Sequence, residues 1–148
     1  MDEPTLTEAE FEDLRCLAGM VIPASAKYNV PGADDDRIVS DIVGSIARDL
    51  DHVRAALGTL RTLAGGSIAA LDAARRVEVA GKLRTEGGLP VRVLTRIILL
   101  CYYRDDRVMV SLGLEARPPF PKGFVVTQGD WSLLDPVRAR KPFWRPVS

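Results

Sequence analysis

Apolar residues recur every three or four positions up to Leu112, which is the spacing of helices that bury one face. The first such stretch begins after Thr7, which forms a capping box with Glu10, and ends before Pro23. Its apolar stripe consists of Phe11, Leu14, Leu17, Ala18 and Val21. The pattern therefore predicts a first helix, followed by a loop over residues 22–36 that contains two prolines.

A second and longer apolar stripe follows this loop. Three consecutive aspartates, residues 34–36, suit the positive end of a helix dipole and can cap the helix. The stripe then runs without interruption at spacings of three and four through Ile38, Ile42, Ile46, Leu50, Val53 and Leu57. We therefore predict one long helix here, which ends before Gly65 and Gly66.

Three more helices are predicted before the pattern ends. One is capped by Asp72 and continues to Arg84. Its expected inner face consists of Val77, Ala80 and Leu83. Val91–Tyr103 is the most apolar part of the chain and is expected to be the central helix of the core. A short helix over residues 105–112 would end at Gly113, which can adopt a left-handed C-cap.

From Glu115 onward, prolines preclude long helices, yet large aromatic residues are retained. Both tryptophans and three of the four phenylalanines occur here: Phe120, Phe124, Trp131, Phe143 and Trp144. Because disordered tails are poor in aromatic residues, we predict an extended arm that lies on a surface, either its own bundle or another protein. The expected fold is all-α in a single domain: a bundle of about five helices over residues 1–114 and an extended C-terminal arm over residues 115–148.

Composition narrows the class of protein. The chain has 148 residues, of which 47% are hydrophobic and 27% charged, as in ordinary globular domains. Twenty basic and twenty acidic side chains give a formal net charge of zero, which argues against a nucleic-acid binder that works by phosphate attraction. The longest apolar run, Ile97–Tyr103, is far shorter than a membrane span, and no export signal is recognisable.

Charge is unevenly distributed along the chain. The first thirteen residues contain six acidic side chains and no basic one. From Arg117 onward, the chain contains six basic side chains and two acidic ones, Asp130 and Asp135. This asymmetry is typical of partner recognition or of pairing within the chain, and two solvated faces would account for it equally well.

The sequence contains no recognisable catalytic machinery. Nucleotide-binding, nucleophile-elbow and metalloprotease motifs are all absent, and a single histidine, His52, excludes histidine-rich constellations. Two cysteines, Cys16 and Cys101, are too few for a zinc site and fall on apolar helices, where they are expected to pack in the core, with a mutual disulfide or a redox or ligand role as the alternatives. We therefore predict no catalytic, cofactor-binding or metal-binding residue in this chain.

The arm carries the predicted partner-binding residues. Tryptophan and arginine dominate interface hot spots, aromatic residues in general are enriched at interfaces, and the proline-rich run at its start could act as a polyproline-type ligand. The same run could instead be a rigid strap over the chain's own helices. The predicted partner-binding residues are Pro118, Pro119, Phe120, Pro121, Phe124, Trp131, Leu133, Leu134, Arg138, Arg140, Phe143, Trp144 and Arg145.

Several short motifs occur in a recognisable order. They are Val21-Ile22-Pro23, Val30-Pro31-Gly32-Ala33, Tyr102-Tyr103-Arg104-Asp105, the Gly113 stop and Pro118-Pro119-Phe120-Pro121-Lys122-Gly123. In this order, over most of the chain, they resemble the gluconate 2-dehydrogenase subunit 3 family. Members of that family are small, helical, non-catalytic subunits that accompany a large FAD-dependent flavoprotein of the glucose-methanol-choline type. The Tyr102–Asp105 motif can also be read simply as a capped junction between two helices.

The resemblance implies a hetero-oligomer in which FAD and the catalytic base belong to the partner. The complex would oxidise hydroxyl groups of sugars, sugar acids or glycosides. Many relatives carry a twin-arginine export signal, and this chain departs from them in lacking one, so we expect a cytoplasmic complex, or a periplasmic one if a signal was removed. The alternative from a different class is a self-contained helical adaptor or regulator that binds a non-enzyme partner through the arm.

Overall fold

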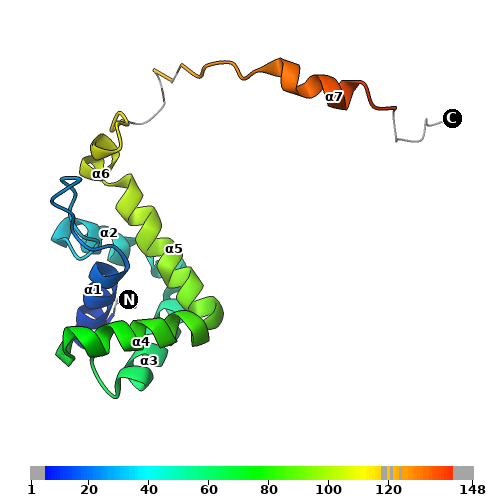
Figure 1. Ribbon diagram of the computed structural model, residues 1–148. Coiled ribbons are helices and arrows are strands. Elements are labelled where there is room, and N and C mark those ends of the chain that lie inside the picture. Colours follow the sequence, from blue (N-terminus) through cyan, green and yellow to red (C-terminus); the bar gives the residue numbers. More distant parts are fainter. Residues whose placement is uncertain (1–5, 118–119, 121, 124, 142–148) are drawn as a thin grey trace. The chain divides into compact units, whose positions relative to one another are not determined.

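The computed structural model describes residues 6–117, 120, 122–123 and 125–141. The protein is all-α, and among the described residues the extended backbone pairs only at one isolated bridge, Ser25 with Val30. The chain divides into two units, Met1–Ala116 and Arg117–Ser148 (Figure 1). Within the described residues, every helix is too short or too polar to cross a lipid bilayer.

The described part of the first unit forms a bundle of six α-helices and two 3-10 turns. The helices are α1 (Glu8–Val21), α2 (Asp36–Ser45), α3 (Leu50–Ala64), α4 (Ala73–Glu86), α5 (Gly88–Arg104) and α6 (Asp106–Ser111). The 3-10 turns are η1 (Ala47–Asp49), between α2 and α3, and η2 (Ile68–Ala70), between α3 and α4. The second unit contains η3 (Trp131–Leu134) and α7 (Asp135–Arg138).

The start of α1 confirms the predicted capping box. The backbone N–H of Thr7 donates to Glu10 Oε2 at 2.8 Å, and the backbone N–H of Glu10 donates to Thr7 Oγ1 at 3.3 Å. These two bonds satisfy backbone donors that have no partner within the helix. Leu14, Leu17 and Ala18 are buried, so the predicted stripe faces the core.

The prediction of one long second helix was wrong, because the chain leaves α2 after Ser45 and resumes as α3 at Leu50. Gly44 and Ser45 are weak helix formers, and the turn η1 lies between the two helices. A short 3-10 turn preserves spacings of three and four, so the apolar pattern cannot distinguish this arrangement from a continuous helix. All six residues of the predicted stripe are nevertheless buried.

The inner face of α4 also differs from the prediction. Asp72 caps the helix as expected, with its Oδ1 accepting from the backbone N–H of Arg75 at 2.8 Å. Val77, however, is 68% exposed, whereas Val79 and Leu83 are buried. Val77 and Leu83 are six positions apart, which places them about 120° apart around a helix. Val79 and Leu83 are four positions apart and therefore lie on the same face. The residues of the predicted face therefore could not all point inward.

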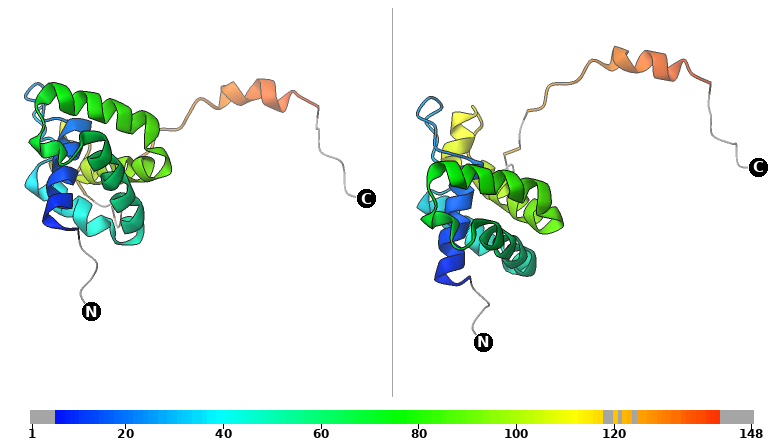
Figure 2. Two further views of the ribbon diagram at one scale, coloured as in Figure 1. Left: turned by 90° about the horizontal axis from the view of Figure 1, so that it is seen from below. Right: turned by 60° about the horizontal axis from the view of Figure 1, so that its bottom comes forward.

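α5 is the central helix of the bundle, as predicted. It packs against α2, α3, α4 and α6, and its buried residues are Leu94, Ile97, Ile98, Cys101 and Tyr102. α4 passes directly into α5 at Gly87 and Gly88, without a separate loop (Figure 2). Gly88 has φ 58°, and a Cβ on Gly87 would lie 2.6 Å from the carbonyl oxygen of Leu83. Both positions of this corner therefore require glycine.

The end of the first unit agrees with the sequence. α6 stops within one turn of Gly113, which has φ 74°, and the backbone N–H of Leu114 donates to the carbonyl of Met109 at 3.0 Å. The left-handed glycine thus satisfies carbonyls at the end of α6. The last buried apolar residue of the core is Val108.

The second unit is not extended throughout, which corrects the prediction for the arm. η3 and α7 form a short helical segment, in which Asp130 Oδ1 accepts from the backbone N–H of Ser132 at 3.0 Å. Pro136 lies in the first turn of α7, where a missing N–H does not interrupt the helix. Proline therefore shortens helices here without excluding them.

Candidate functional site

Groups able to do chemistry are dispersed in the part of the chain that the structure describes. No cluster of three or more His, Cys, Asp or Glu side chains that could hold a metal ion occurs there. His52 is half-buried on α3, and Cys16 and Cys101 are free thiols. Burial raises the pKa of both thiols, which keeps them protonated and unreactive near neutral pH. Large apolar side chains lie exposed on the described part of the chain, and they form the candidate site.

The described apolar residues of the predicted partner-binding set are all exposed. Phe120 is 84% exposed, Trp131 60%, Leu133 74% and Leu134 40%. Val125 and Val126 are exposed as well, and the sequence reasoning did not include them. The described residues of the second unit thus do not bury these apolar side chains among themselves.

Polar contacts within the second unit are local. The Trp131 indole N–H donates to Gln128 Oε1 at 3.1 Å, and Arg138 lies 3.4 Å from Asp135. Hydrogen bonds from the hydroxyl and the backbone N–H of Ser132 lower the pKa of Asp130. Arg140 is exposed. The remaining predicted partner-binding residues lie outside the described part of the chain: Pro118, Pro119, Pro121, Phe124, Phe143, Trp144 and Arg145.

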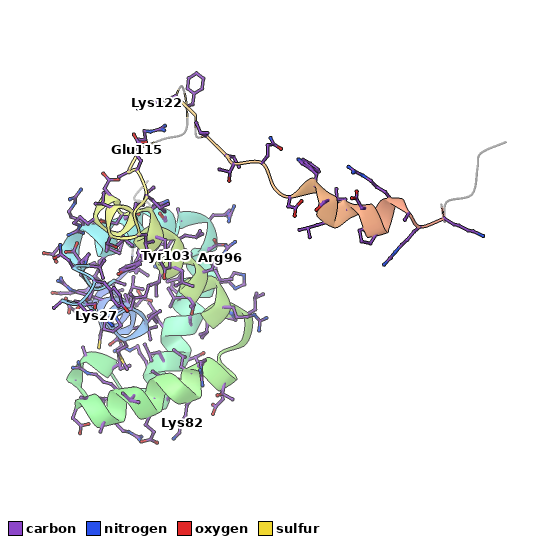
Figure 3. All side chains as sticks on the ribbon, turned by 45° about the horizontal axis from the view of Figure 1, so that its top comes forward. Lys27, Lys82, Arg96, Tyr103, Glu115 and Lys122 are labelled. Atoms are coloured by element: carbon purple, nitrogen blue, oxygen red, sulfur yellow. The ribbon has the colours of Figure 1, made fainter. Side chains whose placement is uncertain are left out.

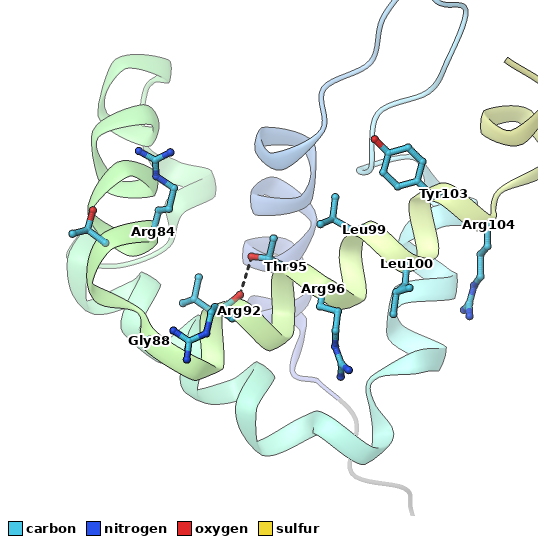
Figure 4. A pocket seen from close by; sticks show the side chains of 11 residues that line it. Arg84, Gly88, Arg92, Thr95, Arg96, Leu99, Leu100, Tyr103 and Arg104 are labelled. Atoms are coloured by element: carbon cyan, nitrogen blue, oxygen red, sulfur yellow. Dashed lines mark hydrogen bonds between the residues drawn. The ribbon is translucent and has the colours of Figure 1, made fainter. Parts of the chain in front are cut away.

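A second exposed apolar surface, which the sequence reasoning missed, follows α5. Leu99, Leu100 and Tyr103 are exposed on the helix that also fills the core. They line an open groove of about 840 Å³ together with four arginines, Arg84 from α4 and Arg92, Arg96 and Arg104 from α5 (Figure 4). We call it the α5 groove. The sequence reasoning treated Val91–Tyr103 only as the core helix and did not separate its exposed apolar positions from its buried ones.

The arginines of the α5 groove differ in their partners. Arg96 lies 3.3 Å from Asp49 of η1, and Arg104 pairs with Asp41 and also donates to Ser45 Oγ at 2.6 Å. Among the described residues, Arg84 and Arg92 have no carboxylate within ion-pair distance. Arg96 and Tyr103 both lie on the surface of α5 (Figure 3). The groove therefore combines apolar contact area with unpaired positive charge.

Three of the motifs that carry the family resemblance, around Ile22, Pro31 and Tyr102, meet in the first unit and have structural roles, whereas the proline-rich run from Pro118 belongs to the second unit. The Tyr102 hydroxyl donates to the carbonyl of Pro31 at 3.2 Å, and the backbone N–H of Ala33 donates to Ile22 at 2.8 Å. These bonds attach the loop between α1 and α2 to α5 and α1. Tyr103, in contrast, remains exposed beside Tyr102.

A network of ion pairs links the start of α2 to the start of α6. Arg107 Nη2 lies 2.7 Å from Asp35 Oδ1, and Arg107 Nε lies 2.9 Å from Asp105 Oδ1. These two aspartates cap α2 and α6. Hydrogen bonds from Arg107 lower the pKa of both carboxyls, so both are ionised at neutral pH. The junction joins two helix starts through one guanidinium.

The chain matches no protein-family model, no curated protein and no solved structure. The resemblance to the gluconate 2-dehydrogenase subunit 3 family therefore depends on its motif residues alone.

Proposed function

We propose that this chain is the small, non-catalytic subunit that binds and stabilises the large FAD-dependent subunit of a dehydrogenase. The complex would act on hydroxyl groups of sugars, sugar acids or glycosides. One observation carries the binding role, namely that large apolar side chains of the second unit are exposed, Trp131 and Leu133 among them. Covering each such side chain stabilises a complex by about 1.5–3 kcal/mol before the losses of association are counted.

The identity of the partner comes from the resemblance. The flavoprotein would bind FAD, supply the catalytic base and take a hydride from the substrate onto the flavin. This chain would contribute interface area, with the aromatic and leucine side chains of the arm as anchors. The arginines of the arm would add orientation more than affinity. We place the complex in the cytoplasm, and cell fractionation would distinguish this from a periplasmic complex.

Co-expression with a flavoprotein of the glucose-methanol-choline type tests the proposal. We expect the tagged chain to retain a large yellow protein through size-exclusion chromatography, with one FAD per large subunit. A Trp131→Ala and Leu133→Ala double variant should lose most of this retention, whereas an Arg75→Ala variant on α4 should not. A colourless, monodisperse monomer in the presence of the flavoprotein would contradict the proposal and favour the adaptor alternative.

A further inference from the structure

The α5 groove is lined by residues of the first unit. Along α5, the residues at the groove follow one another at spacings of three and four, from Arg92 through Arg96 and Leu100 to Tyr103 (Figure 4). At 1.5 Å per residue this row is about 17 Å long, or three helical turns. A row of this length and periodicity matches the contact surface of another helix.

The floor of the groove is apolar. Leu100 is 59% exposed and Tyr103 53%, and Val91 and Leu99 also line the groove. The groove shares Arg84, Val91 and Thr95 with an adjacent cavity of about 400 Å³ that Leu17 and Met20 line from α1. A leucine or aromatic side chain entering from the groove would therefore find apolar walls.

The positive charge of the groove favours a binding partner that carries acidic side chains. Four arginines line it, and no acidic side chain does so among the described residues. Two of the four, Arg84 and Arg92, lack a carboxylate partner within the described chain. Guanidinium groups bind carboxylates through paired hydrogen bonds, and complementary charge across an interface determines partner choice.

The same charge argues against a second copy of this chain. In a twofold-symmetric contact the same surface patch faces itself, so arginines of one α5 would face arginines of the other. Like charges juxtaposed across an interface destabilise it by several kcal/mol. The occupant must supply carboxylates.

We propose that the α5 groove binds an acidic amphipathic helix of a partner protein. Its apolar side chains, at spacings of three and four, would lie on Leu100 and Tyr103, and its Asp or Glu side chains would pair with Arg84 and Arg92. This binding mode does not depend on the proposed role as a dehydrogenase subunit.

Two fluorescein-labelled helical peptides of 17 residues, the length of α5, test the proposal on the full chain. Both have leucines at spacings of three and four, with glutamate at the remaining positions of one and lysine in the other. Fluorescence anisotropy should show the acidic peptide binding at least about tenfold more tightly. Its affinity should fall between about 50 mM and about 300 mM NaCl, because salt screens exposed charges.

Charge reversal identifies the site. Arg84→Glu with Arg92→Glu should weaken the acidic peptide at least about tenfold and improve binding of the basic one. Lys82→Glu provides the matched control, since Lys82 lies on α4 but does not line the groove (Figure 3). If the double variant does not fold by circular dichroism, Leu100→Gln replaces it and should also weaken binding.

Chemical-shift changes in a ¹⁵N-labelled chain complete the test. We expect the acidic peptide to shift amides of α4 and α5 near the groove. Equal binding of both peptides, or shifts confined to other elements, would overturn the proposal. Displacement of the acidic peptide by phosphatidylglycerol vesicles, or dimers of the free chain that dissociate in Arg92→Glu, would overturn it in favour of a lipid surface or a second copy.

Discussion

At the scale of single residues, Asp13 stands out because, among the described residues, it is the one charged side chain that is completely buried. Its Oδ1 accepts from the Ser67 hydroxyl at 2.6 Å and from the backbone N–H of Ile68 at 3.1 Å. Arg61 Nη1 lies 3.3 Å from Oδ2 and balances the charge. One carboxylate therefore holds η2 and α3 against α1.

Replacing Asp13 by alanine should lower the free energy of unfolding by about 1–3 kcal/mol, because the Ile68 N–H would lose its buried acceptor while Arg61 can still reach water. Urea unfolding followed by circular dichroism measures the change. Glu12→Ala, at an exposed neighbouring position of α1, should cost less than about 0.5 kcal/mol. Equal losses in the two variants would show that the Asp13 network contributes nothing.

Arg107 makes stability depend on pH. It lowers the pKa of Asp35 and Asp105 in the folded chain below the ordinary value of about 4. A carboxyl whose pKa falls on folding stabilises the fold above its ordinary pKa, and this contribution disappears as the pH drops through the lower folded value. Stability from this network is therefore present at neutral pH and lost in acid.

Arg107→Gln should accordingly be less stable than the natural chain at neutral pH and should lose less on acidification. Urea unfolding at about pH 7 and about pH 2.5, on either side of the ordinary carboxyl pKa, measures both effects. Arg92→Gln is the matched control and should keep the full pH dependence. An unchanged pH dependence in Arg107→Gln would contradict the assignment.

At the scale of elements, two valines of α4 show that the position of an apolar side chain on its helix, and not its hydrophobicity alone, determines its contribution to stability. Val79 is fully buried, whereas Val77 is exposed two positions earlier. Val79→Ala should lower the free energy of unfolding by about 2 kcal/mol, because it leaves a cavity in the core. Val77→Ala should change it by less than about 0.5 kcal/mol. Thermal and urea unfolding would contradict this assignment if Val77→Ala were the more damaging change.

Helix ends were predictable from the sequence because local groups determine them. Thr7 and Asp72 cap their helices through side chains three residues away or fewer, and Gly113 ends α6 through its own backbone angle. The break between α2 and α3 was not predictable from the apolar pattern, since a 3-10 turn preserves its spacing, whereas the predicted inner face of α4 failed because two spacings of three rotate away from one face. The contacts of Asp13 also escaped prediction, because Ser67 lies more than fifty residues away in the chain.

At the scale of the whole molecule, the core of the first unit is complete before the arm begins. Its buried apolar residues lie between Leu14 and Val108, and the backbone contact of Leu114 with Met109 completes the end of α6. The bundle should therefore fold without the second unit.

Truncation after Ala116 should leave the helical circular dichroism of the bundle intact and change Tm by less than about 4 °C, equivalent to less than about 1 kcal/mol. The truncated chain should no longer co-purify with the flavoprotein. Retained co-purification would show that the arm is not the main docking element, and loss of the fold would show that the bundle needs it.

Of the two exposed surfaces, the sequence indicated the arm and did not indicate the α5 groove. The aromatic residues of the arm were recognisable because prolines separate them from any helical stripe. The α5 groove was hidden, because Leu99 and Leu100 belong to the same apolar run as the buried Ile97 and Ile98. Periodicity identifies an apolar helix, but only the packing of its neighbours shows which side they leave uncovered.

The uncovered side chains of the second unit also bear on how much of this chain a cell retains. Chaperones and proteases continuously remove chains that are incompletely folded, and exposed apolar segments are prone to aggregation. Under the proposed function, a chain made in excess of the flavoprotein would be removed in this way, and we expect its abundance to follow that of the flavoprotein.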